Sequence, residues 1–268
     1  MNFTARTRTF ALLGNPVSHS LSPRMQNAAF HAAGIDAVYV ALRCDADAVV
    51  PTMHLLTRAG GGGNVTVPHK RVAADCAPAA TFDAGTGAIN TFAASDAGLI
   101  VANTDIEAVA GSVAAMGNPD GAWLILGTGG SARSAAAAAV AGGHAVAVSS
   151  RDAARAEAFA NWCDALGAVV VSPAQATVAI NATPLGLADD DGLPCHPDAL
   201  PGVRAVLDLT YRTHGTTAWC SAWRERGVRA LDGREPLLLQ GAAAWRHWFP
   251  GCIPPLDVMR AALSDDVA

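Results

Sequence analysis

The fold of this chain is decided by residues 123–150, WLILGTGGSARSAAAAAVAGGHAVAVSS. A short apolar run leads into a glycine-rich turn, and an alanine-rich segment separates that turn from a second apolar run. This order predicts a strand, a tight turn, a helix and a second strand, because parallel strands need a crossover of this kind. The stretch therefore predicts a nucleotide-binding βαβ unit.

Apolar runs before this stretch continue the same alternation. Runs that predict strands lie at 9–14, 37–42 and 63–67, and a further apolar run lies at 89–94. Between and after them, helices are expected to begin near Ser22 and near Ala46. A third helix is expected to start at Thr104 or Asp105 and to end at Gly117.

The segments after residue 150 also alternate between helix and strand. We expect a helix over 152–165 and strands at 168–171, 178–181 and 203–209. Helical spacing resumes at Pro236 and again after Pro255, and these last helices could pack back on the first domain. Parallel strands with crossover helices fit this order best.

The composition of the 268-residue chain excludes several classes of protein. Hydrophobic residues make up 51% of it and charged residues 15%, so it can bury a sizeable core. A net charge of -5 without any run of Lys or Arg argues against a nucleic-acid-binding protein. No stretch of about 20 apolar residues could cross a bilayer, and the N-terminus does not read as a signal peptide. We expect a cytoplasmic protein whose partner is a small molecule.

The cysteines give no support to a metal site or a disulfide framework. None of them approaches a CxxC or a metal-ligand spacing, so reduced thiols and no bound metal are expected. The six cysteines are Cys44, Cys76, Cys163, Cys195, Cys220 and Cys252.

The glycine turn matches the G-x-G-x-x-A fingerprint directly after an apolar strand. Backbone N–H groups in such a turn can approach a pyrophosphate at a helix N-terminus. The residues expected to contact the cofactor are Gly127, Gly129, Gly130, Ser131 and Ala132. A tight turn without a ligand is the alternative, and the flanking strand and helix weigh against it.

The end of the second apolar run bears on the choice of cofactor. An acidic residue about 20 positions after the glycines usually binds the ribose 2′-hydroxyl of NAD. Here the run ends at Ser150, and Arg151 and Arg155 follow one helical turn apart, where they could grip a 2′-phosphate. We therefore predict NADP, held by Ser150 and both arginines. NAD is the alternative because of Asp152, which lies slightly late for ribose capture, and the arginines could instead only solvate a helix face.

Seven further motifs, found in a fixed order along nearly the whole chain, resemble the shikimate and quinate dehydrogenase family. They are GNPVSHSLSPRMQNAAF (14–30), GNVTVPHK (63–70), GAINTF (87–92), ANTD (102–105), NATPLGL (181–187), DLTY (208–211) and DGREPLLLQGA (232–242). The resemblance implies an NADP-dependent oxidoreductase that reversibly reduces 3-dehydroshikimate to shikimate. Quinate or another cyclic hydroxy acid is the alternative substrate.

The resemblance also implies roles for individual residues. Lys70 and Asp105 would be catalytic, the lysine at an exposed tip after a proline turn and the aspartate at another tip. The substrate would contact Ser20, Ser22, Thr66, Asn90, Tyr211 and Gln240, side chains that suit a hydroxylated ring because each can form hydrogen bonds. Ser22 could also act as a helix N-cap. Taken without the family, Lys70 would be a solvated surface lysine.

Four residues of the later motifs would line the cofactor cleft by the same resemblance. They are Asn181, Ala182, Thr183 and Gly233. Asn and Thr at a strand end often only close a turn, which is the alternative for the first three.

We thus expect an α/β protein of two domains with a cleft between them. Residues 1–106, completed by C-terminal helices at 237–268, would form an α/β substrate-binding domain. Residues 107–236 would form a Rossmann-like NADP-binding domain with a parallel sheet. A monomer and a homodimer are both compatible with the sequence.

The chain departs from the family pattern at several positions. A histidine is replaced by Gln26, a glycine by Ile106, which Glu107 follows, a proline by Thr213 and a methionine by Pro236. We expect the bulk of Ile106 near the reacting centre. These departures leave open a paralogue with another substrate, and a binding protein that has lost turnover is a second alternative.

Overall fold

The computed structural model describes residues 4–75, 81–82, 85–96, 98–188 and 190–264. The chain divides into two compact units. The first unit comprises Met1–Thr104 and Gln240–Ala268, and the second comprises Asp105–Leu239.

The first unit is built on a mixed sheet. Within its described residues, six strands are ordered β2-β1-β3-β5-β6-β4. The strands are β1 (Arg8–Gly14), β2 (Ala37–Arg43), β3 (Gly62–Val65), β4 (Thr81–Phe82), β5 (Thr91–Ser95) and β6 (Gly98–Ala102). The helices are α1 (Ser22–Ala32), α2 (Ala46–Arg58), α3 (Lys70–Asp75) and α9 (Leu256–Ala262), together with the later part of α8 (Arg234–Trp248).

The directions of these strands only partly follow the expected alternation. Strand β1 pairs in parallel with β2 and β3, as helical crossovers require. Strands β5 and β6 instead form an antiparallel hairpin, and β5 also runs antiparallel to β3. The sequence alone indicated the apolar run of β5 and did not indicate its partner β6.

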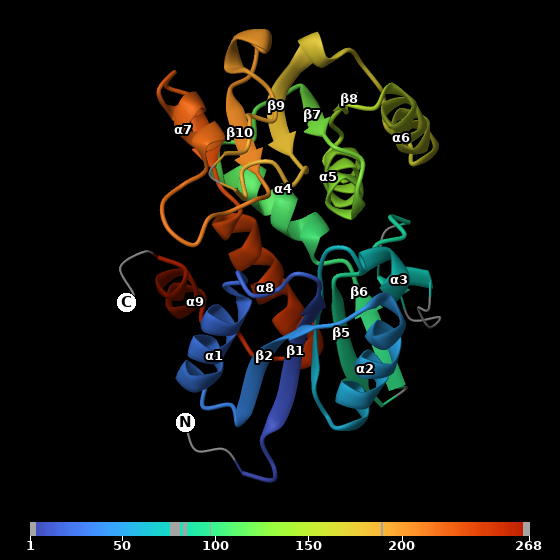
Figure 1. Ribbon diagram of the computed structural model, residues 1–268, viewed down its shortest axis with the longest axis vertical. Helices are drawn as coiled ribbons and strands as arrows, with labels where there is room; N and C mark the ends of the chain where they lie inside the picture. The colour runs from blue at the N-terminus through green and yellow to red at the C-terminus, as the bar shows by residue number, and fades with distance from the viewer. Residues whose placement is uncertain (1–3, 76–80, 83–84, 97, 189, 265–268) are drawn as a thin grey trace. The chain divides into compact units, whose positions relative to one another are not determined.

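Aromatic side chains tie the C-terminal helix α8 to the start of the first unit. Phe10 of β1 lies with its ring centroid 5.1 Å from Trp248 and 5.4 Å from Phe249. Phe30 of α1 lies 5.8 Å from Trp245. Helix α9 packs on α1, as Figure 1 shows. Burial of aromatic rings of this size is a large stabilising contribution, so these helices complete the core of this unit.

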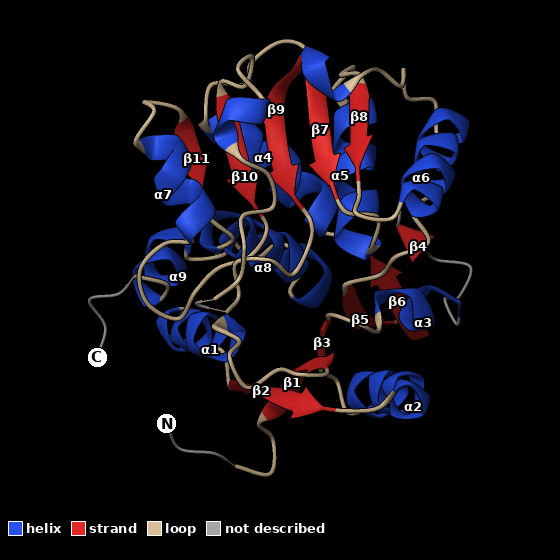
Figure 2. Ribbon diagram, turned by 45° about the horizontal axis from the view of Figure 1, so that its top comes forward, coloured by secondary structure: helices blue, strands red, loops and turns tan. Residues whose placement is uncertain are grey.

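The second unit is a parallel sheet with helical crossovers, as the sequence predicts. In its described residues, five strands are ordered β11-β10-β9-β7-β8 and all pair in parallel (Figure 2). The strands are β7 (Ala122–Leu126), β8 (Val146–Ser149), β9 (Ala176–Asn181), β10 (Ala205–Asp208) and β11 (Arg229–Leu231). The helices are α4 (Asp105–Ala115), α5 (Gly130–Ala141), α6 (Ala153–Ala165), α7 (Ala218–Arg224) and the first part of α8.

One expected strand of this unit is wrong. Residues 168–171 form only a single bridge, between Val170 and Val146 of the edge strand β8. Val169 is 68% exposed, so this run of apolar residues does not form a buried strand. Strand β11 and helix α7 were not expected from the sequence.

The alanine-rich helix α5 explains how the glycine turn is held. Small buried side chains let its backbone lie close to the sheet and to α4. Because all strands of this unit are parallel, their carboxyl ends meet at one edge, where ligands of open α/β sheets bind. The segments that follow β7, β8, β9 and β10 at this edge carry the residues predicted to hold the cofactor.

Candidate functional site

The glycine turn leaves β7 in a backbone conformation that suits only glycine. Gly127 has a φ of +109°, and an added Cβ there would lie 2.9 Å from the carbonyl oxygen of Ala182. At Gly129, an added Cβ would meet nothing within 4 Å, so this side of the turn is open. Helix α5 starts without a side-chain cap. The turn therefore fits the pyrophosphate of a dinucleotide, which needs a close backbone and a helix N-terminus.

The residues after β8 present two exposed arginines. Asp152 is the N-cap of α6, and its Oδ1 accepts a hydrogen bond of 3.0 Å from the backbone of Arg155. Its Oδ2 lies 3.6 Å from Nε of Arg155, whose side chain is 76% exposed. Arg151 is exposed as well. The one carboxylate in this segment is thus engaged in capping, and the guanidinium groups fit a phosphate better than a ribose hydroxyl.

A buried carboxylate lies at the carboxyl end of β10. Asp208 is 0% exposed, and its Oδ1 accepts hydrogen bonds from Nδ2 of Asn181 at 2.8 Å and from N and Oγ1 of Thr210 at 3.0 and 2.7 Å. Its Oδ2 accepts from Oγ1 of Thr217 at 2.7 Å. Withdrawal from water raises the pKa of Asp208 above its ordinary value, and these donors act against that rise.

The residues after β9 close a turn beside this carboxylate. Oδ1 of Asn181 accepts from N and Oγ1 of Thr183 at 3.0 and 2.7 Å, and its Nδ2 donates to the carbonyl of Leu185 at 3.0 Å. The backbone N–H of Gly233 donates to the carbonyl of Thr210 at 2.8 Å, where an added Cβ would collide. Asn181 and Thr183 therefore do close a turn, at the edge where the cofactor is expected.

Lys70 is the first residue of α3 and is half-buried, so the expectation of an exposed tip is wrong. The loop before it is held from two sides, since Nε2 of buried His69 lies 2.8 Å from the carbonyl of Cys44 and the carbonyl of Lys70 accepts from the backbone of Ile89 at 2.9 Å. Thr66, at the start of this loop, is also half-buried. The backbone that carries Lys70 is therefore fixed by neighbouring strands and loops.

Asp105 likewise opens a helix, α4, and is half-buried. It directly follows Thr104, whose N and Oγ1 donate to Oδ1 of Asn90 at 2.8 and 3.1 Å. The Nδ2 of Asn90 donates to Oε1 of Gln240 at 3.5 Å. These bonds set the orientation of the Asn90 amide, because a backbone N–H can only donate.

The serines at the start of α1 do not fit the N-cap interpretation. The N-cap residue is Leu21, and Ser22 makes no side-chain capping bond. Instead, the hydroxyl of Ser20 accepts from the backbone N–H of Ser22 at 3.2 Å. Pro23 fills the first turn, where its missing N–H costs nothing. The N-cap interpretation of Ser22 is thus wrong.

The predicted substrate residues fall in both units. Ser20, Ser22, Thr66, Asn90 and Gln240 lie in the first unit, and Tyr211 lies half-buried in the second. The two predicted catalytic residues divide in the same way, with Lys70 in the first unit and Asp105 at the start of the second. The predicted cofactor residues, Gly127, Gly129, Gly130, Ser131, Ala132, Ser150, Arg151, Arg155, Asn181, Ala182, Thr183 and Gly233, all lie in the second.

Sequence reasoning missed two buried polar groups next to these residues. The hydroxyl of Tyr39 donates to Oδ1 of Asn64 at 2.8 Å, and Nδ2 of Asn64 donates to the carbonyl of Asn90 at 3.0 Å and points to Gln240 Oε1 at 3.5 Å. The other missed group is Asp208. A polar residue inside or at the end of an otherwise apolar strand was the available signal for Asn64 and Asp208.

The fold accommodates three of the departures from the family pattern. The side chain of Gln26 is fully buried, accepts from Nε1 of Trp245 at 2.8 Å and donates to the carbonyl of Gly241 at 3.4 Å. Ile106 packs against the core of the second unit, so the expectation that its bulk lies at the reacting centre is not supported. Pro236 lies in the first turn of α8, where proline is tolerated.

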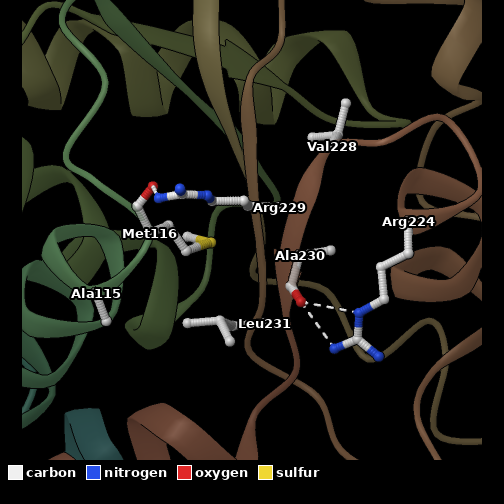
Figure 3. A pocket seen from close by; sticks show the side chains of 7 residues that line it. All are labelled: Ala115, Met116, Arg224, Val228, Arg229, Ala230 and Leu231. Carbon is white, nitrogen blue, oxygen red and sulfur yellow. Dashed lines mark hydrogen bonds between the residues drawn. The ribbon is translucent and has the colours of Figure 1, made fainter.

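Other features of the described residues offer little chemistry. A hollow of about 320 Å³ lies beside β11, and Figure 3 shows the guanidinium groups of Arg224 and Arg229 on either side of this strand. They donate to the carbonyls of Ala230 and Met116, so they do not converge on a ligand. Burial raises the pKa of the Cys220 thiol to about 12, so it is a poor nucleophile.

Two kinds of feature are absent from the described residues. No group of three or more His, Cys, Asp and Glu side chains there could hold a metal ion. Nor does any helix in this part of the chain reach the length and hydropathy that crossing a membrane requires.

A parallel-sheet unit with a glycine turn after its first strand, joined to a mixed α/β unit, is typical of dinucleotide-binding proteins. The family model of the shikimate dehydrogenase substrate binding domain matches residues 12–92. The shikimate dehydrogenase (NADP(+)) of Anaeromyxobacter dehalogenans is 37% identical over 280 residues, which cover 96% of this chain and 96% of that protein. That of Halobacterium salinarum is 37% identical over 264 residues, covering 95% and 97%.

A solved structure agrees with these relatives. The shikimate 5-dehydrogenase of Thermus thermophilus, in complex with NADP(H) and shikimate, has a TM-score of 0.83 at 31% identity and covers 96% of this chain and 98% of that chain. The chain therefore belongs to the shikimate dehydrogenase family and is an oxidoreductase.

The raised pKa of Asp208 leads to a prediction about stability. Its folded-state pKa lies above the ordinary value of 3.8, so the folded chain holds this proton more strongly than the unfolded chain. The resulting stabilisation is complete below pH 3.8 and is lost as pH rises through the folded-state pKa. The free energy of unfolding of the wild type should therefore fall relative to that of Asp208→Asn as pH rises. Urea unfolding of both proteins from pH 3.8 upward measures the difference between their free energies of unfolding. A difference that does not change with pH would contradict the raised pKa of Asp208.

Proposed function

We propose that this protein is an NADP-dependent shikimate dehydrogenase that reversibly reduces 3-dehydroshikimate to shikimate. The observation that carries the proposal is the pairing of two sets of residues in one chain. The first unit holds the hydroxyl and amide side chains predicted to bind substrate together with Lys70, and the second holds an open glycine turn followed by two exposed arginines. The relatives are shikimate dehydrogenases (NADP(+)), and the Thermus thermophilus enzyme was solved with NADP(H) and shikimate, which supports this substrate and cofactor.

The two units would divide the work. We propose that the first unit binds the cyclic hydroxy acid and that the second binds NADP. The pyrophosphate would lie on the backbone of the glycine turn at the start of α5, with the 2′-phosphate on Arg151 and Arg155. When bound, the nicotinamide supplies or accepts the hydride.

Lys70 and Asp105 would transfer the proton and stabilise the charge that develops on the substrate oxygen. As a ketone is reduced, negative charge grows on its oxygen, and an ammonium within hydrogen-bond reach stabilises that charge and donates a proton. The carboxylate of Asp105 would orient this ammonium and accept a hydrogen bond from the reacting hydroxyl. The backbone bonds that hold His69, Lys70 and Thr104 favour this role, because a preorganised donor does not have to reorganise during the reaction.

Substrate recognition would depend on neutral side chains. Ser20 and Ser22 would contact the carboxylate, and Thr66, Asn90 and Gln240 would contact the carboxylate or the ring hydroxyls, with Tyr211 closing the pocket. The Oδ1 of Asn90 is occupied by Thr104, so Asn90 would approach the substrate as a hydrogen-bond donor.

A substrate panel tests the function directly. The purified chain is incubated with shikimate, quinate or aminoshikimate and with NADP or NAD, and absorbance of the reduced cofactor is followed. We expect the highest kcat/KM for shikimate with NADP. A higher value for quinate assigns the chain to the paralogue, and bound NADP without any reduction would falsify the enzymatic proposal.

Substitution of the two catalytic residues separates chemistry from binding. Lys70→Ala and Asp105→Asn should each lower kcat by about 10²-fold or more and change KM less, because both act on charge that develops in the transition state. Arg71→Ala is a matched control, since Arg71 is the exposed neighbour in the same helix. If either variant keeps its kcat and only KM rises, that residue binds substrate and the proposed pair is wrong.

The choice between cofactors is tested at the arginines. The double variant Arg151→Ala, Arg155→Ala should bind NADP at least about tenfold more weakly and NAD almost unchanged, since a hydrogen bond to a charged group contributes about 1.5 to 3 kcal/mol. Exposed Arg204 precedes β10, at the opposite edge of the sheet, and Arg204→Ala is the control. Equal losses for both cofactors would rule out the 2′-phosphate contact.

A further inference from the structure

We propose that Asp208 is a positioning residue for the cofactor, holding the segments after β9 and β10 in the arrangement that lets the glycine turn receive it. This inference rests on the proposed function, because it assumes that the dinucleotide binds at this edge of the second unit. Among the described residues, the side chain of Asp208 makes no salt bridge that would otherwise explain a fully buried carboxylate. A buried charge is retained only with strong compensation, and here the compensation comes entirely from these two segments.

Two series of hydrogen bonds, here called arms, start at Asp208. The first arm leads to the glycine turn. Oδ1 of Asp208 fixes the amide of Asn181, and the opposite end of that amide fixes N and Oγ1 of Thr183. Between them lies Ala182, whose N–H donates to the carbonyl of Leu126 at 2.9 Å and whose carbonyl lies directly against Gly127. A shift of Asn181 would therefore move the backbone that borders the glycine turn.

The second arm leads from Asp208 into the segment after β10. Asp208 binds both N and Oγ1 of Thr210, while the carbonyl of Thr210 accepts from Gly233 at the start of α8. The hydroxyl of Thr210 also lies 3.5 Å from the carbonyl of Leu185, which joins the two segments to each other. On its other oxygen, Asp208 orients Thr217, the N-cap of α7.

The carboxylate of Asp208 is the main link between the two arms, beside the contact of Thr210 with the carbonyl of Leu185. Three donors converge on Oδ1 and one on Oδ2, so replacement by Asn can keep the oxygen that serves Asn181 and Thr210. Its amide would then face Thr217, whose hydroxyl oxygen can accept instead of donating. Replacement by Ala leaves all these buried donors without their acceptor, and the segments must move to satisfy them.

The test compares cofactor affinity in variants of matched stability. Asp208→Ala should raise the Kd for NADP at least about tenfold. A displacement of about 1 Å caused by a distant substitution can cost about 10²-fold in activity, so a shift of the backbone beside the glycine turn should have a large effect on binding as well. Asp208→Asn should recover most of that loss. Val206→Ala is the control, because Val206 lies on the same strand, is 0% exposed and belongs to the apolar core, with a side chain that cannot form hydrogen bonds. It should lose stability and keep the wild-type Kd for NADP.

Thr210→Val keeps the inference testable if Asp208→Ala does not fold. This nearly isosteric change removes the hydroxyl bonds to Asp208 and Leu185 and leaves the carboxylate in place. We expect an intermediate rise in the Kd for NADP, measured by fluorescence titration well below the midpoint of thermal unfolding, and an unchanged Kd for shikimate.

The outcomes separate this inference from the proposed function. If the wild type binds NADP and the Asp208 and Thr210 variants bind it equally well, Asp208 has only a structural role and the positioning inference is overturned while the function stands. If Val206→Ala weakens NADP as much as Asp208→Ala, general loss of stability is the cause and the inference is again overturned. A wild type that binds no nicotinamide dinucleotide overturns both.

Discussion

A polar group that is withdrawn from water has to find its partner inside the protein, and both units are organised around this requirement. In the second unit, the carboxylate of Asp208 gathers donors from two strand ends. In the first unit, the amides of Asn64, Asn90 and Gln240 satisfy one another and the hydroxyl of Tyr39. An unsatisfied group in either place would cost about 1 to 3 kcal/mol. In each unit, the geometry of these buried groups is thus set by hydrogen bonds that no ligand has to make.

The parallel half of the fold was predictable because its signals are local and repeated. A glycine turn between an apolar run and an alanine-rich helix has few alternatives, and α5 and β7 lie where the sequence places them. The prediction of a strand at 168–171 was wrong because an apolar run alone does not reveal that Val169 is exposed to solvent at the edge of a sheet. The hairpin of β5 and β6 was missed because an antiparallel partner leaves no crossover to detect in the sequence.

Candidate site residues could be proposed from sequence motifs, whereas the hydrogen bonds that hold them in place could not. Lys70 was expected at an exposed tip, yet it opens α3 and is half-buried, and its carbonyl accepts a hydrogen bond from the backbone of Ile89 in a distant segment. The helix expected to start at Thr104 or Asp105 is found, and Asp105 is half-buried at its start. Asn64 is bonded to Tyr39 of β2, and Asp208 is bonded to Asn181 of β9. Pairing of this kind depends on the register between strands, which one sequence does not display. Gln26 shows the same limit, since its partner Trp245 lies more than two hundred residues away.

The double use of Asp152 has a consequence for redesign of this enzyme. Its carboxylate caps α6 and also lies beside Arg155, so the start of that helix and the placement of a guanidinium group depend on a single side chain. Loss of such a cap commonly costs about 1 kcal/mol. With the 2′-phosphate on the two arginines as proposed, a protein engineer who wished to change the preferred nucleotide would have to leave Asp152 intact and work at Ser150 and Arg151. A change at the cap would alter the stability of α6 and the placement of Arg155 together.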